Sequence, residues 1–175
     1  DTTEWKSRDQ AGLILLCAGY DPLAHLTARV RAYTARAARR ECVIGGIDTG
    51  TVILAELGLL AGAKAVLHYE AEAAFRERWP SVDVTDQIYC LDGNRLTAAG
   101  GTATGDAMLA WIERDVSASL AQATANRMVH GEPRRSETPQ RKMTSTDPVL
   151  LRMHQMMIEN IVQPISVKRI CTQLG

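Results

Sequence analysis

The stretch Gly45-Gly46-Ile47-Asp48-Thr49-Gly50 separates a short apolar run from a strongly helical one. Glycines on both sides of one central residue are typical of a tight turn from a strand into a helix, because the bend leaves no room for bulk. The central residue is Asp48, and the turn exposes its side chain near a helix N-terminus, where backbone N–H groups stabilise negative charge. The sequence therefore predicts a strand–turn–helix unit with a carboxylate at its tip.

Short apolar runs alternate with helical patterns on both sides of this turn. The patterns predict strands at 12–17, 41–44 and 64–69, and helices at about 24–40 and 49–58. This order of elements is typical of a parallel α/β sheet. Later patterns predict a hairpin over 83–91 and 95–99, followed by helices at about 105–113 and 116–129.

The C-terminal part of the sequence differs in composition and in its pattern of apolar residues. Residues 131–146 contain prolines and basic residues without apolar periodicity, which predicts a linker. Asp147 and Pro148 are typical of the N-cap and first position of a helix. Pro164 ends that helix, and Ser166 is typical of the start of another. Two short helices are therefore expected after the linker.

Composition excludes several classes of protein. The chain has 20 Lys and Arg residues against 20 Asp and Glu residues, so no overall basic field indicates a nucleic-acid or membrane partner. The four cysteines show neither CxxC pairing nor clustering with histidines, which predicts reduced thiols in the cytoplasm and no metal site. The longest apolar stretch, 11–19, is far shorter than the roughly 20 residues of a membrane-spanning helix.

Three interpretations of Asp48 follow from its local chemistry. It caps the following helix, or it is a carboxylate nucleophile, or it recognises a cation or hydrogen-bond donor at the bottom of a ligand pocket. A nucleophile needs a general base nearby, and of the histidines His25, His68, His130 and His154 only His68 is well placed. His68 is equally well explained as a buried imidazole bonded to backbone.

Several blocks of sequence carry a resemblance to one family: 47–62, 65–70, 96–103 and 106–109, with further matches at Phe75, at Trp79-Pro80 and at 164–166 with 170–171. The chain resembles the GlxA family of bacterial AraC-type transcription regulators. The resemblance implies an α/β fold, flavodoxin-like and class I glutamine amidotransferase-like, with a parallel sheet flanked by helices. It also implies that the family's first strands would precede Asp1 and that its recognition helix would follow Gly175.

The resemblance implies three regions. Residues 1–130 would form an amidotransferase-like ligand-sensing domain without its N-terminal part, 131–146 the linker, and 147–175 the start of an AraC-type helix-turn-helix DNA-binding domain. Relatives that keep amidotransferase or protease chemistry have cysteine at the position of Asp48. A carboxylate cannot replace a thiolate in thioester chemistry, so the chain is expected to be no enzyme and to need no catalytic residue, cofactor or metal.

The Asp48-Thr49-Gly50 form of the turn looks like the subgroup that senses quaternary-ammonium compounds such as glycine betaine, dimethylglycine or carnitine. The resemblance thus implies a cytoplasmic homodimer that responds to such an effector, or to an amino-acid-like one, and activates catabolic genes. DNA would be a partner of the intact protein only. The alternatives are an amidotransferase-fold hydrolase using Asp48 and His68, and a chain that has lost ligand binding.

The expected ligand-binding residues are Asp48, Thr49, His68, Tyr69 and Glu70. A trimethylammonium group is held by aromatic faces and carboxylates, and the candidate faces are Tyr69, Trp79, Tyr89 and Trp111. The expected DNA-binding residues are Ser166, Lys168 and Arg169, in the part of the DNA-binding domain that the chain contains.

Overall fold

The computed structural model describes residues 11–24, 26–40, 42–141 and 147–174. The chain divides into two units, the first ending at Gln140 and the second beginning at Arg141. The predicted strand start at Glu41, the histidine His25 and residues 142–146 of the predicted linker lie outside the described residues. Each unit is described by itself.

The first unit is built on a four-stranded sheet with the order β1-β2-β6-β5. β1 (Leu13–Ala18) and β2 (Val43–Asp48) run parallel, and β2 is also parallel to β6 (Arg95–Ala98). β5 (Tyr89–Asp92) forms the antiparallel hairpin with β6. A separate parallel pair consists of β3 (Lys64–Ala65) and β4 (Asp83–Val84). The mostly parallel sheet confirms the predicted α/β class.

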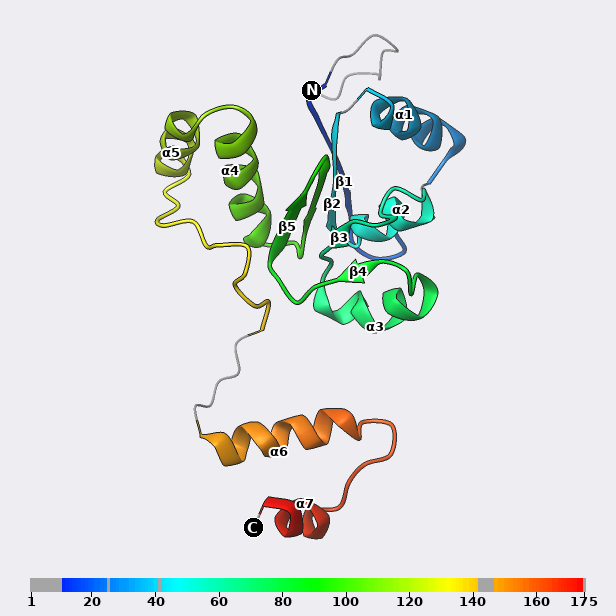
Figure 1. The fold of residues 1–175 in the computed structure, drawn as a ribbon, viewed down its shortest axis with the longest axis vertical. Coiled ribbons are helices and arrows are strands. Elements are labelled where there is room, and N and C mark those ends of the chain that lie inside the picture. Colours follow the sequence, from blue (N-terminus) through cyan, green and yellow to red (C-terminus); the bar gives the residue numbers. More distant parts are fainter. Residues whose placement is uncertain (1–10, 25, 41, 142–146, 175) are drawn as a thin grey trace. The chain divides into compact units, whose positions relative to one another are not determined.

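Helices cover both faces of the sheet (Figure 1). On one face lie α1 (Ala28–Ala38) and α2 (Gly50–Glu56), with α3 (Tyr69–Arg78) below them in the view, and on the other lie α4 (Ala103–Asp115) and α5 (Ala118–Arg127). Two apolar cores correspond to the two faces. Ile44, Leu54 and Phe75 belong to the first, and Leu96 and Ala107 to the second. Full burial of one such large apolar side chain contributes about 1.5–3 kcal/mol.

The structure corrects the predicted strand at 64–69. β3 ends at Ala65, and α3, which the sequence patterns did not indicate, begins at Tyr69. The buried residues Val66 and Leu67 resemble a strand in sequence, but side chains satisfy the backbone of Val66. Its N–H donates to Thr97 Oγ1 at 2.9 Å, and its carbonyl oxygen accepts from Thr51 Oγ1 at 2.7 Å. No strand partner is needed there.

Other boundaries also differ from those predicted. The predicted strand 83–91 is divided into β4, which pairs with β3, and β5, which pairs with β6. β2 continues through the two glycines to Asp48, so Gly45 and Gly46 belong to the strand rather than to a separate turn. A Cβ on Gly46 would lie 2.6 Å from the backbone nitrogen of Thr51, which explains why a buried strand carries glycine at that position. α1 begins at Ala28, after Thr27 as N-cap, and not near residue 24.

The second unit contains α6 (Pro148–Glu159) and α7 (Val167–Leu174), and it buries Met156 and Ile170. Asp147 caps α6 by accepting a hydrogen bond from the backbone N–H of Val149 at 2.8 Å.

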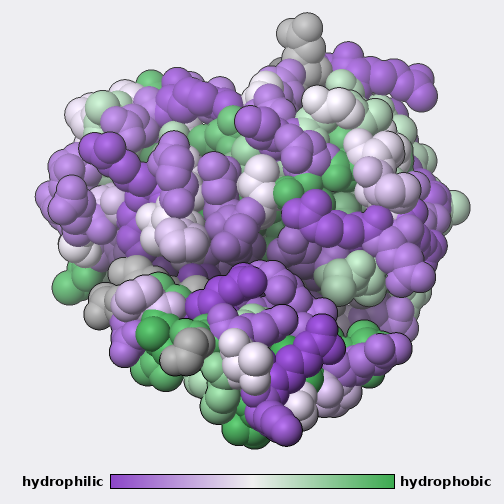
Figure 2. Space-filling view, turned by 60° about the horizontal axis from the view of Figure 1, so that its bottom comes forward, coloured by the Kyte–Doolittle hydropathy of each residue, from purple (hydrophilic) through white to green (hydrophobic). Residues whose placement is uncertain are grey.

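The surface is mixed in character. Figure 2 shows a face on which hydrophilic residues predominate and apolar ones form separate patches. Within the part of the chain that the structure describes, no helix combines the length and the apolar character needed to cross a membrane.

Candidate ligand-binding site

Asp48 occupies a strained backbone position at the end of β2. Its φ is 58°, in the left-handed region that few residues other than glycine adopt. The turn is tight on all sides: a Cβ on Gly50 would overlap the carbonyl oxygen of Leu16, and a Cβ on Gly100 would lie 3.0 Å from Asp48 Cβ. Strained backbone of this kind clusters at functional sites, because only the surrounding packing keeps it in place.

Asp48 does not cap the helix that follows it. The N-cap residue of α2 is Thr49, which makes no side-chain capping hydrogen bond, and its hydroxyl donates to the carbonyl oxygen of Gly19 instead. Among the described residues, none donates a hydrogen bond to the Asp48 carboxylate. The side chain is only partly buried, so its oxygens are available to a ligand.

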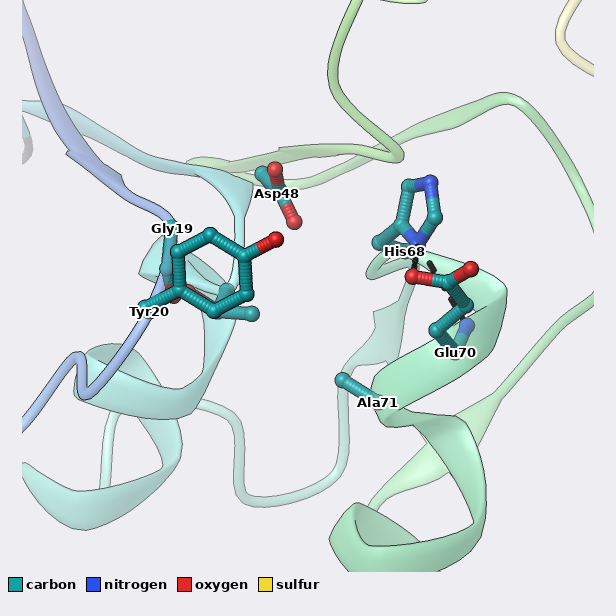
Figure 3. A pocket seen from close by; sticks show the side chains of 7 residues that line it. Gly19, Tyr20, Asp48, His68, Glu70 and Ala71 are labelled. Atoms are coloured by element: carbon teal, nitrogen blue, oxygen red, sulfur yellow. Dashed lines mark hydrogen bonds and ion pairs between the residues drawn. The ribbon is translucent and has the colours of Figure 1, made fainter.

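A cavity of about 380 Å³ lies in front of this carboxylate. Three segments form it: the loop after β1, the turn after β2 and the start of α3 (Figure 3). The cavity falls in the range of 300–1,000 Å³ typical of small-molecule sites. The lining residues are Gly19, Tyr20, Asp48, Thr49, His68, Glu70 and Ala71.

His68 and Glu70 form the wall opposite Asp48 (Figure 3). His68 is the N-cap of α3, and its Nδ1 accepts the backbone N–H of Glu70 at 3.4 Å. That contact leaves Nε2 as the protonated nitrogen of the neutral ring. The Glu70 carboxylate lies 3.8 Å from His68 Nδ1, and its side chain is 73% exposed, so solvent screens its charge.

The cavity has the electrostatics of a cation site. Its lining includes the carboxylates of Asp48 and Glu70 but neither lysine nor arginine, and cysteine is also absent from the lining. Two like charges in one partly enclosed space attract a cation more strongly than either does alone. Clusters of three or more His, Cys, Asp or Glu side chains able to hold a metal ion do not occur within the described ranges.

Four of the five predicted ligand residues line the cavity, namely Asp48, Thr49, His68 and Glu70. Tyr69 does not. Its ring lies against the His68 ring, with centroids 4.5 Å apart, and its hydroxyl donates to Glu70 at 3.3 Å. Tyr69 therefore contacts two residues of the cavity wall without lining the cavity itself.

The other predicted aromatic faces belong to the cores. Trp79 packs on Phe75 with ring centroids 5.0 Å apart, and Tyr89 and Trp111 belong to the core on the α4 side. The aromatic residue at the cavity is Tyr20, which the sequence analysis did not select. Its only signal in the sequence was its place directly after the first strand and Gly19.

The predicted DNA-binding residues lie at the start of α7 in the second unit. Ser166 caps this helix by accepting the backbone N–H of Arg169 at 3.3 Å, and the side chains of Lys168 and Arg169 are exposed.

Known proteins resemble the chain in sequence over most of its length. It is 40% identical over 134 residues to the HTH-type transcriptional regulator CdhR of Pseudomonas aeruginosa, a match covering 77% of this chain and 40% of the relative. It is 33% identical over 174 residues to the HTH-type transcriptional regulator ArgR of the same species, covering 96% of this chain and 53% of the relative. The relatives of this chain are HTH-type transcriptional regulators. The chain spans about half of their length, and no protein-family model matches it.

Solved structures agree with these matches. An AraC family transcriptional regulator from Pseudomonas putida superposes with a TM-score of 0.59 at 25% identity, over 67% of this chain and 63% of that one. A THiJ/PfpI family protein from Pseudomonas syringae has a TM-score of 0.59 at 25% identity, over 92% and 64% of the two chains. The matches confirm the predicted resemblance to AraC-type regulators and the amidotransferase-like fold.

Proposed function

We propose that this chain is the ligand-sensing part of a transcriptional regulator and that a small cationic metabolite binds in the cavity between Asp48 and Glu70. The observation that carries the proposal is the Asp48 carboxylate itself. It stands at a strained turn, faces a cavity of ligand size and accepts no hydrogen bond from the described residues. A buried or half-buried charge without a partner costs free energy, and a ligand that pairs with the charge removes that cost.

The chemistry of the lining favours an ammonium group over an anion. Tyr20 offers an aromatic ring, and the two carboxylates offer charge. A quaternary ammonium group has no N–H to donate, so it relies on such contacts, with a ring contributing about 0.5–1 kcal/mol at an exposed site. Glycine betaine and carnitine carry such a group, and dimethylglycine carries a tertiary ammonium that can also donate one N–H to a carboxylate. All three are zwitterions, and amino-acid-like metabolites are the second class to compare.

We expect binding without turnover because of the residue at the turn. The family resemblance implies a nucleophilic cysteine at this position in catalytic relatives, and Asp48 would supply charge in its place. The ligand would then favour one arrangement of the sensor relative to the DNA-binding helices, which is a shift of population between existing states. In the intact homodimer we expect this shift to activate catabolic genes.

DNA contact would come from the start of α7. Lys168 and Arg169 are exposed there, and basic side chains at a helix start contact phosphates, which position a protein without reading sequence. The full-length regulator with Lys168→Ala or Arg169→Ala should bind DNA more weakly and with a smaller salt dependence.

The direct test is a thermal-shift screen with glycine betaine, dimethylglycine, carnitine and simple amino acids. A ligand that binds only the native state must raise the melting temperature. We expect at least one of these ammonium compounds to do so with the wild type and with Asp86→Asn, which changes an exposed carboxylate outside the cavity. The Asp48→Asn variant should show no shift, and an equal shift in Asp48→Asn would refute the proposal.

A hydrolase is the competing function, because Asp48 and His68 share one cavity. Assays with amide and ester substrates separate the two functions. Turnover by the wild type that is lost in Asp48→Asn supports the hydrolase, whereas binding without turnover supports the sensor.

A further inference from the structure

Residues 134–140, here called the strap, form the last segment of the first unit and bond to the rest of it at several points, although the sequence predicts a linker there. The backbone N–H of Ile88 donates to the carbonyl oxygens of Ser136 and Thr138, at 3.3 and 3.0 Å. Gln87 and Pro139 form an antiparallel bridge. The strap therefore runs beside the residues that lead into β5 and ends where the second unit begins.

A buried carboxylate anchors the beginning of the strap. Asp106 on α4 has no exposed surface, and it accepts hydrogen bonds from the backbone N–H of Arg134 at 3.0 Å and from Arg134 Nε at 2.9 Å. His130, just before the strap, completes the set with Nε2 at 2.8 Å from the same carboxylate. Charge-assisted bonds of this kind are roughly twice as strong as neutral ones. This end of the strap is fixed.

Gln140 ties the other end of the strap to the cavity wall. Its side-chain oxygen accepts the backbone N–H of Tyr69 at 3.0 Å, and its side-chain nitrogen donates to the carbonyl oxygen of Leu67 at 2.9 Å. These two backbone groups flank His68, which lines the cavity. The amide thus satisfies two backbone groups at the start of α3, where an N-terminal N–H has no partner within the helix.

We propose that Gln140 is a positioning residue that couples the ligand cavity to the second unit, and that the strap is the element that transmits ligand binding. The inference rests on the proposed sensor function. A ligand that moves His68 also moves the backbone groups on both sides of it, which are the groups that hold Gln140. Arg141 follows directly and opens the unit that carries α6 and α7. Coupling of this kind must be reciprocal, so the strap also acts on the cavity.

Trypsin cleavage after Arg135, within the strap, measures how often the strap detaches, because cleavage of a folded segment requires local opening. In the full chain without ligand, Gln140→Ala removes two hydrogen bonds and should raise the cleavage rate about 5- to 30-fold, since each lost hydrogen bond corresponds to a factor of about five. Gln122→Ala, on α5, is the matched control and should leave it unchanged. Circular dichroism verifies that each variant is folded.

The coupling itself is tested from the cavity side. His68→Ala removes the N-cap acceptor of α3 and should also raise cleavage after Arg135, whereas His68→Asn, which keeps an acceptor, should restore the wild-type rate. His154→Ala in the second unit is the control. An unchanged rate in His68→Ala, or in Gln140→Ala, would overturn the proposal.

Glycine betaine then separates the strap from the sensor function. Binding that slows cleavage in the wild type and is about fivefold weaker in Gln140→Ala supports both proposals. If betaine binds but does not change the cleavage rate, and its affinity does not depend on Gln140, the proposal for the strap is overturned and the sensor function stands. If neither betaine nor the other screened compounds bind, the sensor function fails, while the variant cleavage rates still decide whether the cavity and strap are coupled.

Discussion

The position of Asp48 makes two demands, one on the backbone and one on the side chain, and few residue types meet both. Its backbone lies at a φ of 58°, and its side chain must present a charge to the cavity. Most L residues lose about 1–2 kcal/mol in the left-handed region, but Asp and Asn, which have short polar side chains, adopt it more readily. An acidic residue at this turn is therefore compatible with the fold as well as with cation binding.

The backbone effect and the charge effect are separable by mutation. Asp48→Asn keeps the conformational tolerance, so its free energy of unfolding should stay within about 0.5 kcal/mol of the wild type. Asp48→Ala should lose about 1 kcal/mol. Urea unfolding followed by tryptophan fluorescence measures this, since Trp79 and Trp111 both lie in the first unit. Equal stability of the two variants would contradict a strained turn.

Asp106 is the residue whose ionisation matters most for the strap. Burial raises the pKa of this carboxyl, but hydrogen bonds from His130 and Arg134 and the charge of Arg134 outweigh burial and hold the pKa below its ordinary value. A depressed folded-state pKa contributes stability above the ordinary carboxyl pKa of about 4, and that stability is lost as the pH falls through the folded-state value.

We therefore expect Asp106→Asn to lower the free energy of unfolding at neutral pH by about 1–3 kcal/mol. The difference from the wild type should shrink below about pH 4, because protonation then removes the same charge from the wild type. Urea unfolding across this pH range is the measurement. A difference that stays constant down to the lowest pH would show that the charge of Asp106 does not stabilise the fold.

At the scale of elements, the segment between β3 and α3 depends on two threonine side chains. Thr51 and Thr97 bond the carbonyl oxygen and the N–H of Val66 and take the place of a neighbouring strand. They hold the backbone immediately before His68, so the start of α3 and the cavity wall depend on them.

Replacing one of these threonines tests this dependence. Thr97→Val preserves shape but leaves the buried N–H of Val66 without an acceptor, which should cost about 1–3 kcal/mol of unfolding free energy. Amide exchange at Val66 should accelerate in the same variant. Thr124→Val on α5 is the control, because its hydroxyl only donates to a carbonyl of its own helix. A stability loss no larger than that of the control would refute the role of Thr97.

Local patterns predicted those elements whose signals are local. The apolar run before Gly45, the small residues around Asp48 and the caps Asp147 and Ser166 all act on neighbours in sequence, and the strand–turn–helix unit and the last two helices followed from them. Val66 and Leu67 misled the prediction because their buried backbone is satisfied by side chains from distant elements.

The sequence predicted only part of the cavity lining, because some of its residues are brought together by contacts between distant segments. Four lining residues follow directly from the turn and the segment after β3, whereas Tyr20 reaches the cavity through the packing of β1 against β2. The contacts of the strap could not be predicted at all. Arg134 and Gln140 bind residues 28 and 71 positions away in the sequence, and a polar, proline-containing stretch gives no sign of such contacts.

For the molecule as a whole, the two proposals together separate sensing from output. In them, Asp48 on β2 recognises the ligand and the start of α3 responds to it. The strap, through Gln140, ties the start of α3 to the residue before the second unit. Under the proposed function, an amidotransferase-like fold serves as a receptor, because the turn after β2 carries the fixed charge of Asp48.

The measurement that tests this account most directly is calorimetric titration of the full chain with glycine betaine and with 3,3-dimethylbutanoate, the uncharged-head isostere in which carbon replaces nitrogen. The account predicts that the wild type binds betaine, that it does not bind the isostere, and that Asp48→Asn binds neither. Equal binding of both compounds, or undiminished betaine binding by Asp48→Asn, would contradict a cation site at this turn.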